Sequence, residues 1–298
     1  MKHLLSMEQL TKEDITKILN LADQMKYEQK NGIAHQVLKG KQLAMIFAKS
    51  STRTRVSFEV GMSQLGGSAL FLSQNDIQLG RGESIEDTAK VLSRYVDGIM
   101  IRTFDQSDVE ELAQYANIPI INGLTDSSHP CQILADLMTM REYHTVLEGK
   151  TVAWVGDGNN VCHSLMVGAT TMGMKMKVAT PVGYEPDAAL LEKLGDKVVL
   201  TNDPKVAVTG ADVVVTDTWI SMGQEDEKES RVETFSPYQV NDELMALAND
   251  GAIVQHCLPA YKGYEITEAV FAKHATTIYD EAENRLHAQK SVMAILMG

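Results

Sequence analysis

Short apolar segments alternate with helix-like segments along almost the whole chain. A first series of apolar segments lies at residues 43–47, 69–72, 99–101 and 118–121. A second series comprises "KTVAWV", "KMKVATP", "KVVLTND", "ADVVVTDTW", "GAIVQHCLP" and "TTIYDE". Strands joined by helical crossovers pair in parallel and have both faces covered. The alternation therefore predicts an α/β protein with two doubly wound parallel-sheet domains. We expect the active site in the cleft between them.

Two helices can be placed from their end signals. Residues 11–32 carry apolar side chains at helical spacing, with Thr11 as the cap and Gly32 as the stop. The segment "PCQILADLMTMREYH" starts with Pro130 in the favoured first-turn position and leads into the second series. We place the domain boundary near this helix, which ends at His144.

Bulk properties exclude several classes of function. The formal net charge of −13 argues against a nucleic-acid surface, since such surfaces neutralise phosphates with Lys and Arg. The longest apolar stretches are shorter than the roughly 18 to 20 residues that span a bilayer. The three cysteines have no C-x-x-C spacing and no secretory signal accompanies them, which disfavours disulfides and a zinc site. A protein of the reducing cytoplasm is expected.

The stretch "FAKSSTRTRVSFEVG" at residues 47–61 predicts an anion site. It follows a strand and precedes a helix, so residues 50–55 are expected to form the turn. Free backbone N–H groups at a helix N-terminus attract anions, and hydroxyl and guanidinium groups add further donors. A single serine that caps the helix would leave the arginines unexplained. Because no G-x-x-x-x-G-K-[ST] pattern occurs, the expected ligand is a small phosphate and not a nucleoside triphosphate.

Polar residues also follow the other predicted strands. Ligands of open parallel sheets bind outside the carboxyl ends of the strands. There the sequence has Arg102, "DSSHPCQ" at 126–132, "GDGNN" at 156–160, "DTWISMG" at 217–223, "HCLPA" at 256–260 and "DEAENRLH" at 280–287. An arginine beside a buried strand is costly without a partner, and a bound phosphate or carbonyl oxygen would supply one to Arg102.

Several of these residues have competing interpretations. "GDGNN" lacks the third glycine of a dinucleotide fingerprint, because position 161 is Val. Asn159 and Asn160 can be turn formers, although we favour a ligand contact for Asn160. His129 alone is typical of a structural residue in a helix-entry turn.

The segments around Cys257 and after Asp217 also have two interpretations each. Cys257 and His256 suggest a nucleophile pair, but neighbours on an extended chain point to opposite faces, which favours a polarising or substrate-binding thiol. The charged run "QEDEKESRVE" is typical of solvated surface, yet a loop hinged at Gly223 could close over a substrate. Asp217 would then bind an α-ammonium group.

Five motifs in this order, "STRTR", "HPCQ", "DTWISMG", "HCLPA" and "DEAENRLH", resemble the aspartate/ornithine carbamoyltransferase family over nearly the whole chain. "SMG" and "HCLPA" are similar to its ornithine branch. The resemblance implies a carbamoyl-phosphate-binding domain at 1–130, joined by a C-terminal helix at about 284–298. An interdomain helix at 131–146 and an ornithine-binding domain at 147–283 would follow.

The resemblance also implies the roles of individual residues. Arg102, His129 and Cys257 would be catalytic. Carbamoyl phosphate would be bound by Ser51, Thr52, Arg53, Thr54, Gln78, Arg102, His129, Pro130, Cys131, Gln132, Cys257, Leu258 and Arg285. Ornithine would be bound by Asn160, Asp217, Ser221 and Met222.

The implied reaction is direct attack of the ornithine δ-amine on carbamoyl phosphate, without a metal or a covalent intermediate. Its products are citrulline and phosphate, in arginine biosynthesis or catabolism. The family resemblance also implies a homotrimer. Two alternatives remain open: a carbamoyltransferase for putrescine or acetylornithine, and a catalytically silent scaffold of the same fold.

Overall fold

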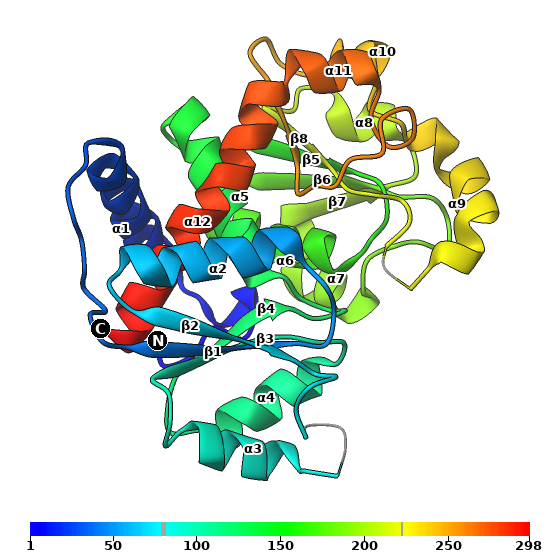
Figure 1. Cartoon of the computed structure of the whole chain (residues 1–298). Coiled ribbons are helices and arrows are strands. Elements are labelled where there is room, and N and C mark those ends of the chain that lie inside the picture. Colours follow the sequence, from blue (N-terminus) through cyan, green and yellow to red (C-terminus); the bar gives the residue numbers. More distant parts are fainter. Residues whose placement is uncertain (79–81, 222) are drawn as a thin grey trace. The chain divides into compact units, whose positions relative to one another are not determined.

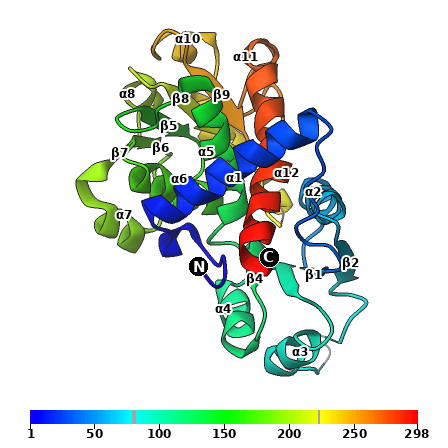
Figure 2. The same cartoon turned by 90° about the vertical axis from the view of Figure 1, so that its left-hand side faces the viewer.

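The computed structural model describes residues 1–78, 82–221 and 223–298. The chain divides into two compact units, Met1–Met138 with Glu283–Gly298, and Thr139–Ala282. Within the described residues each unit is built on one parallel sheet (Figures 1 and 2). The predicted fold class of two parallel-sheet α/β domains is therefore confirmed. None of the helices in these ranges combines the length and apolar character that a bilayer crossing needs.

The first unit contains a sheet with the strand order β2-β1-β3-β4. Its strands are β1 (Gln42–Phe47), β2 (Ser68–Ser73), β3 (Gly98–Arg102) and β4 (Ile120–Leu124). Its helices are α1 (Lys12–Lys30), α2 (Thr52–Gln64), α3 (Ile85–Leu92) and α4 (Gln106–Tyr115), after a short 3-10 turn at Met7–Gln9. In Figure 1, α3 and α4 cover one face of the sheet and α2 covers the other.

The second unit contains a sheet with the order β7-β6-β5-β8-β9. Its strands are β5 (Thr151–Val155), β6 (Lys175–Ala179), β7 (Val198–Thr201), β8 (Val213–Thr216) and β9 (Ile253–His256). Its helices are α6 (Asn160–Thr171), α7 (Ala188–Leu194), α8 (Pro204–Val208), α9 (Lys228–Phe235), α10 (Asp242–Met245) and α11 (Glu268–Lys273). Helices α5 (Pro130–His144) and α12 (Ala275–Met297) each contribute residues to both units.

Both helices placed from their end signals are confirmed. Thr11 caps α1, since its Oγ1 accepts from the backbone N–H of Asp14 at 3.1 Å and the Asp14 carboxylate accepts from the Thr11 N–H at 3.2 Å. Gly32 follows the helix with φ of +70°. Helix α5 has the predicted bounds, Pro130–His144.

The order of the strands brings the candidate segments together at one point in each sheet. In the first sheet the chain reverses its winding between β1 and β3, and Phe47 pairs with Arg102 at their carboxyl ends. In the second sheet the reversal lies between β5 and β8. Residues after β5 and β8 are therefore neighbours, and Thr216↔His256 pairing places the end of β9 beside them. Ligands of doubly wound sheets bind at such switch points.

The prediction of a strand at "TTIYDE" is wrong, because residues 276–281 lie inside helix α12. Thr276, Thr277 and Ile278 favour strands by propensity, but tertiary contacts override that preference here. The Thr277 hydroxyl donates to the carbonyls of His274 and Val254, each at 2.8 Å. Ile278 packs into the core of the second unit. The C-terminal helix therefore starts at Ala275 and not near residue 284, and "DEAENRLH" does not follow a strand.

Candidate active site

The anion site predicted after β1 has a shorter turn than expected. Helix α2 already begins at Thr52, and Ser51 caps it by accepting from the Thr54 N–H at 3.2 Å. Arg53 and Thr54 therefore lie in the first helical turn, not in a loop before it. Thr54 is buried and Arg53 half-buried, whereas Thr52 and Arg55 are exposed. A helix N-terminus with these donors still favours an anion.

Three arginines surround His129 in the first unit. Arg102 ends β3, His129 immediately precedes α5, and both are buried. Burial, followed by the charges of Arg285, Arg102 and Arg53, holds the pKa of His129 well below its ordinary value. His129 is therefore neutral at pH 7. Guanidinium groups from three separate elements create a positive potential at this point, which an anion would offset.

Arg285 joins three elements of the first unit through its guanidinium. Its Nη1 donates to Oε1 of Gln132 on α5 at 2.7 Å, and its Nη2 donates to Oγ1 of Thr54 on α2 at 3.2 Å. Its Nε donates to Oε1 of Gln289, one turn along α12, at 2.9 Å. All four side chains are buried. The structure thus brings together predicted residues that lie more than 150 positions apart.

Three further predicted residues of this unit are Pro130, Cys131 and Gln78. Pro130 is buried at the start of α5. The Cys131 thiol is turned into the core, where it donates to the Asn122 carbonyl at 3.4 Å and burial raises its pKa to about 12. Cys131 could therefore contact a ligand only through its backbone. Gln78 is exposed in the segment after β2.

Lys49 is a buried residue that the motif analysis did not single out. Its ammonium pairs with Asp126 in the segment before α5 and lies 4.3 Å from the centre of the Phe104 ring. It therefore links the segment after β1 to the segment after β4. Its position directly before the serine-rich turn was the only sequence signal for it.

In the second unit, Asn159 both caps a helix and contacts Asp217, and the ligand contact predicted for Asn160 stays a prediction. Asn159 caps α6, since its Oδ1 accepts from the N–H groups of Val161 and Cys162 at 3.0 and 3.1 Å. Its Nδ2 donates to Oδ2 of Asp217 at 2.9 Å. Asn160 is the half-buried first residue of the helix. A capping asparagine can thus also orient a carboxylate at the neighbouring strand end.

The second glycine of "GDGNN" has a packing explanation. A Cβ at Gly158 would lie 2.4 to 2.6 Å from backbone atoms of Tyr184, Glu185 and Pro186. The Gly158 N–H donates to the Tyr184 carbonyl at 2.9 Å. The turn after β5 therefore needs glycine there to pack on the segment after β6, and no bound pyrophosphate is required to explain it.

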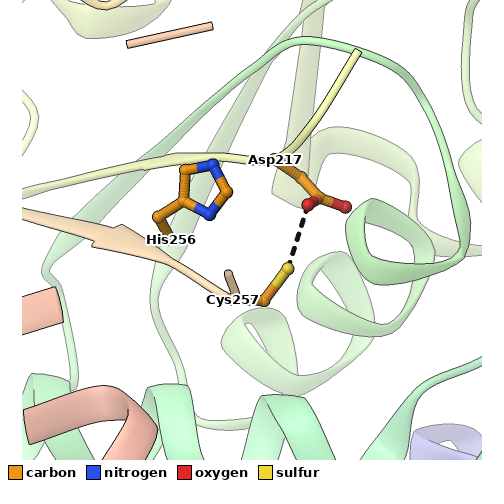
Figure 3. Close-up of side chains that lie close together, drawn as sticks. All are labelled: Asp217, His256 and Cys257. Atoms are coloured by element: carbon orange, nitrogen blue, oxygen red, sulfur yellow. Dashed lines mark hydrogen bonds between the residues drawn. The ribbon is translucent and has the colours of Figure 1, made fainter. Parts of the chain in front are cut away.

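Asp217 is the centre of a compact cluster in the second unit (Figure 3). The Cys257 thiol donates to Asp217 Oδ1 at 2.9 Å, and the Thr218 N–H donates to the same oxygen at 2.7 Å. A carboxylate oxygen of Asp217, a ring nitrogen of His256 and Sγ of Cys257 all lie within 4.8 Å of one another. Asp217 is buried and Cys257 half-buried.

The expectation that His256 and Cys257 point to opposite faces is wrong. Strand β9 ends at His256, so the alternation of a strand does not extend to Cys257, and both side chains lie near Asp217. The ring of His256 is nevertheless engaged elsewhere. Its Nδ1 accepts from the Leu258 N–H at 2.9 Å, so Nε2 carries the proton and donates to Oε1 of Glu265 at 2.9 Å. His256 could act as a base on Cys257, or bind a metal ion, only if its ring gave up the hydrogen bond to Leu258 or the one to Glu265.

The loop after β8 is held at its base by aromatic and ionic contacts. Trp219 stacks on Tyr264 with ring centroids 6.3 Å apart, and Tyr264 stacks on Tyr261 at 6.2 Å. Arg231 of the charged run is buried and donates to Asp157 and to the Trp219 carbonyl. At the tip, the Ser221 N–H donates to Oε1 of Gln224 at 3.0 Å. Met222, which we predicted to bind ornithine, lies outside the described residues.

Comparisons with known proteins cover the whole chain. Residues 2–142 match the family model for "Aspartate/ornithine carbamoyltransferase, carbamoyl-P binding domain", and residues 148–296 match the model for its "Asp/Orn binding domain". A protein of Carboxydothermus hydrogenoformans named ornithine carbamoyltransferase is 58% identical over 304 residues, covering 100% of this chain and 98% of the relative. A protein of Archaeoglobus fulgidus with the same name is 52% identical over 301 residues, covering 100% of this chain and 98% of the relative.

Solved structures give the same result. The ornithine carbamoyltransferase structure from Pyrococcus furiosus is 51% identical with a TM-score of 0.95, covering 100% of this chain and 97% of that one. The structure from Thermus thermophilus is 42% identical with a TM-score of 0.91, covering 100% and 99%.

Proposed function

The chain belongs to the aspartate/ornithine carbamoyltransferase family, and on that premise we propose that it transfers the carbamoyl group of carbamoyl phosphate to the δ-amine of L-ornithine. The products are L-citrulline and phosphate. The observation that carries the proposal is the gathering of Arg53, Arg102 and Arg285 around a neutral His129 at the switch point of the first sheet. Such a group of donors suits a dianionic phosphate next to a polarisable carbonyl.

The donor side of the proposed site belongs to the first unit, with two residues from the loop after β9. Ser51, Thr54 and the N-terminus of α2 bind phosphate oxygens, and the planar guanidinium groups add bidentate contacts. Helix α12 contributes Arg285 although most of the donor residues precede residue 133. The full proposed set is Ser51, Thr52, Arg53, Thr54, Gln78, Arg102, His129, Pro130, Cys131, Gln132, Cys257, Leu258 and Arg285.

The acceptor side belongs to the second unit. Asp217 is a buried carboxylate at the end of β8 and binds the α-ammonium group of ornithine, with Asn160, Ser221 and Met222 around the amino-acid end. The bonds that Asp217 accepts from Asn159, Thr218 and Cys257 fix its orientation. This arrangement favours an acceptor with a free α-amino group. Acetylornithine lacks that positive charge, and putrescine lacks the α-carboxylate.

The chemistry that we propose is direct addition and elimination. The neutral δ-nitrogen forms a bond to the carbonyl carbon, the carbon–oxygen bond to phosphate breaks, and the departing phosphate takes up the proton that the nitrogen loses. Arg102, with a neutral His129, stabilises the developing oxyanion, and the phosphate leaves with its electron pair into the α2 N-terminus. Alignment of reactants can supply roughly 7 to 11 kcal/mol in well-oriented systems, so the site needs no covalent intermediate.

We propose further that the protein is a cytoplasmic homotrimer. The family resemblance supports the trimer, and three free cysteines fit a reducing compartment. Strand β2 lies at the edge of its sheet and exposes apolar side chains, with Leu70 47% and Phe71 38% exposed. Val56 on neighbouring α2 is 50% exposed. Exposed apolar edges of this kind mark surfaces that pair with another chain. Light scattering in solution measures the assembly, and a monomer would refute this part of the proposal.

The function is tested by offering carbamoyl phosphate with ornithine, putrescine, N-acetylornithine or aspartate separately and measuring ureido products. Turnover with ornithine alone is expected. Asp217→Asn should raise the KM for ornithine and leave the KM for carbamoyl phosphate unchanged. Preference for another acceptor would overturn the acceptor side. Binding of phosphate without turnover of any acceptor would support a silent scaffold instead.

A further inference from the structure

Leu258, in the loop after β9, has a backbone conformation that needs outside support. Its φ is +59°, in the left-handed region that residues with a Cβ rarely adopt. Such conformations persist where surrounding contacts hold them, and they concentrate at functional sites. Leu258 follows Cys257, whose thiol donates to Asp217. The backbone at Leu258 therefore decides where this thiol and the adjoining carbonyl lie.

The contact that supports Leu258 comes from the side chain of His256. The Leu258 N–H donates to Nδ1 of His256 at 2.9 Å. A neutral imidazole accepts at one nitrogen and donates at the other, so this bond requires the proton on Nε2. Oε1 of Glu265 accepts that proton at 2.9 Å. Glu265 thereby selects the tautomer of His256 that can accept from Leu258.

Glu265 closes the loop from its other end as well. Its Oε1 also accepts from the Tyr261 N–H at 2.6 Å. The backbone N–H of His256 donates to Oε2 of Glu281 at 2.8 Å. His256 and Glu265 are both 0% exposed. Residues 257–260 are thus spanned by a brace that runs from Leu258 through the buried His256 and Glu265 side chains and back to Tyr261.

We propose that His256 is a positioning residue, which acts through the Leu258 backbone to hold Cys257 and the adjoining peptide in place beside Asp217, with Glu265 setting its tautomer. This inference rests on the proposed function, because that function makes Cys257 part of the active site. His256 itself has no role as a base here, because its ring nitrogens serve Leu258 and Glu265. The bond to Leu258 should therefore be the one that the reaction depends on directly, and the bond to Glu265 should matter only through the tautomer of His256.

Two substitutions separate the two bonds. In His256→Asn the amide oxygen takes the place of Nδ1 and can accept from the Leu258 N–H, but the side chain is too short for Glu265. In His256→Gln the amide nitrogen takes the place of Nε2 and can donate to Glu265, while the acceptor for Leu258 is lost. His256→Asn leaves Glu265 Oε1 with only the Tyr261 N–H, and His256→Gln leaves the Leu258 N–H without its acceptor, so each variant removes one hydrogen bond of the brace.

The first measurement is steady-state kinetics on the full-length protein, with thermal unfolding of the same samples. His256→Gln should lower kcat by about 100-fold, because a displacement on the order of 1 Å in a reactive site has that effect. His256→Asn should remain within about tenfold of the wild type, since it keeps the positioning bond. Equal losses of kcat in both variants, or losses that follow the melting temperature, would overturn the proposal.

The second measurement does not depend on activity. The half-buried Cys257 is alkylated with iodoacetamide, and mass spectrometry follows each cysteine, with the buried Cys131 and Cys162 as internal controls for unfolding. Faster labelling of Cys257 alone in His256→Gln, with wild-type labelling in His256→Asn, is expected. Unchanged Cys257 labelling in His256→Gln, or faster labelling of all three cysteines, would reduce His256 to a structural residue. If the wild type forms no citrulline, the proposed function fails, and the labelling still decides the role of His256.

Discussion

Arg231 on α9 donates from Nη1 to Oδ2 of Asp157 at 2.8 Å and from the same nitrogen to the Trp219 carbonyl at 2.9 Å. Asp157 follows β5 and Trp219 follows β8, so one guanidinium ties together the two loops at the switch point of the second sheet. Burial raises the pKa of Asp157, although the Arg231 charge opposes that shift. The loop after β8, called the acceptor loop below, is therefore anchored by a buried ion pair whose arginine belongs to a run of mostly exposed charges.

Replacing Arg231 with Gln should destabilise the second unit and misplace the acceptor loop. Removing one partner of a buried ion pair costs about 3 to 5 kcal/mol, because the other charge is left uncompensated. We expect a lower melting temperature and a higher KM for ornithine, with the KM for carbamoyl phosphate unchanged. Arg231→Gln combined with Asp157→Asn should recover most of the stability. A double variant no more stable than the single one would contradict the pairing.

Arg53 is expected to bind phosphate through its planar fork. Arg53→Lys keeps the charge and loses the bidentate geometry, which should raise the KM for carbamoyl phosphate by about 10- to 100-fold, the value of one charge-assisted hydrogen bond. Arg55→Lys is the matched control, since Arg55 is exposed and bonds to Glu59 at 3.0 Å. Steady-state kinetics of both variants test this. An equal effect of the two changes would remove Arg53 from the site.

Gly158→Ala should destabilise the protein through steric overlap. The added Cβ would lie within 2.6 Å of three backbone atoms of residues 184–186, which cannot move as a flexible side chain could. We expect a loss of about 1 to 3 kcal/mol in the free energy of unfolding, measured by urea denaturation. Gly183→Ala meets no atom within 4 Å but has φ of +88°, so it reports backbone strain alone. Wild-type stability of Gly158→Ala would refute the packing explanation.

Lys290 on α12 should make stability depend on alkaline pH. It is fully buried, and its ammonium donates to Oε1 of Gln64 at 2.8 Å and lies 3.0 Å from Nε2 of His35. Burial lowers its pKa from 10.5 to about 8, with Glu28 opposing the shift. A lowered pKa means that the unfolded chain holds the proton more tightly. Burying the charged Lys290 therefore lowers the free energy of unfolding by about 3 kcal/mol. This loss is nearly complete below pH 8 and disappears as the pH rises toward 10.5.

The measurement compares the free energies of unfolding of wild type and Lys290→Met at pH 7.5 and pH 10. Other titrating groups are common to both proteins and cancel in the difference. The Met side chain cannot titrate, so the advantage of this variant over wild type should fall by about 2 kcal/mol between pH 7.5 and pH 10. Lys290→Met loses the contacts with Gln64 and His35 at both pH values, so this loss changes both stability differences by the same amount. A difference that stays constant with pH would show that Lys290 keeps an ordinary pKa.

The local pattern of the sequence predicted most of the architecture. Alternating apolar and helical segments predicted both parallel sheets, and the capping signals at Thr11 and Pro130 predicted where α1 and α5 begin. These features depend on the side-chain period and on end groups within a few residues, which a single sequence displays. The segment at 276–281 failed because its β-branched residues suggest a strand, while long-range packing keeps it helical.

What the sequence alone determined is the kind of chemistry available at each strand end: arginines and hydroxyls after β1 and β3, and a carboxylate and a thiol after β8 and β9. Only the tertiary structure decided which of these groups meet. It placed Arg285 against Gln132 and Thr54, gave Asn159 the contact with Asp217, and engaged both nitrogens of His256 away from Cys257. These pairings depend on the order of the strands and the packing of distant helices, which local periodicity does not encode.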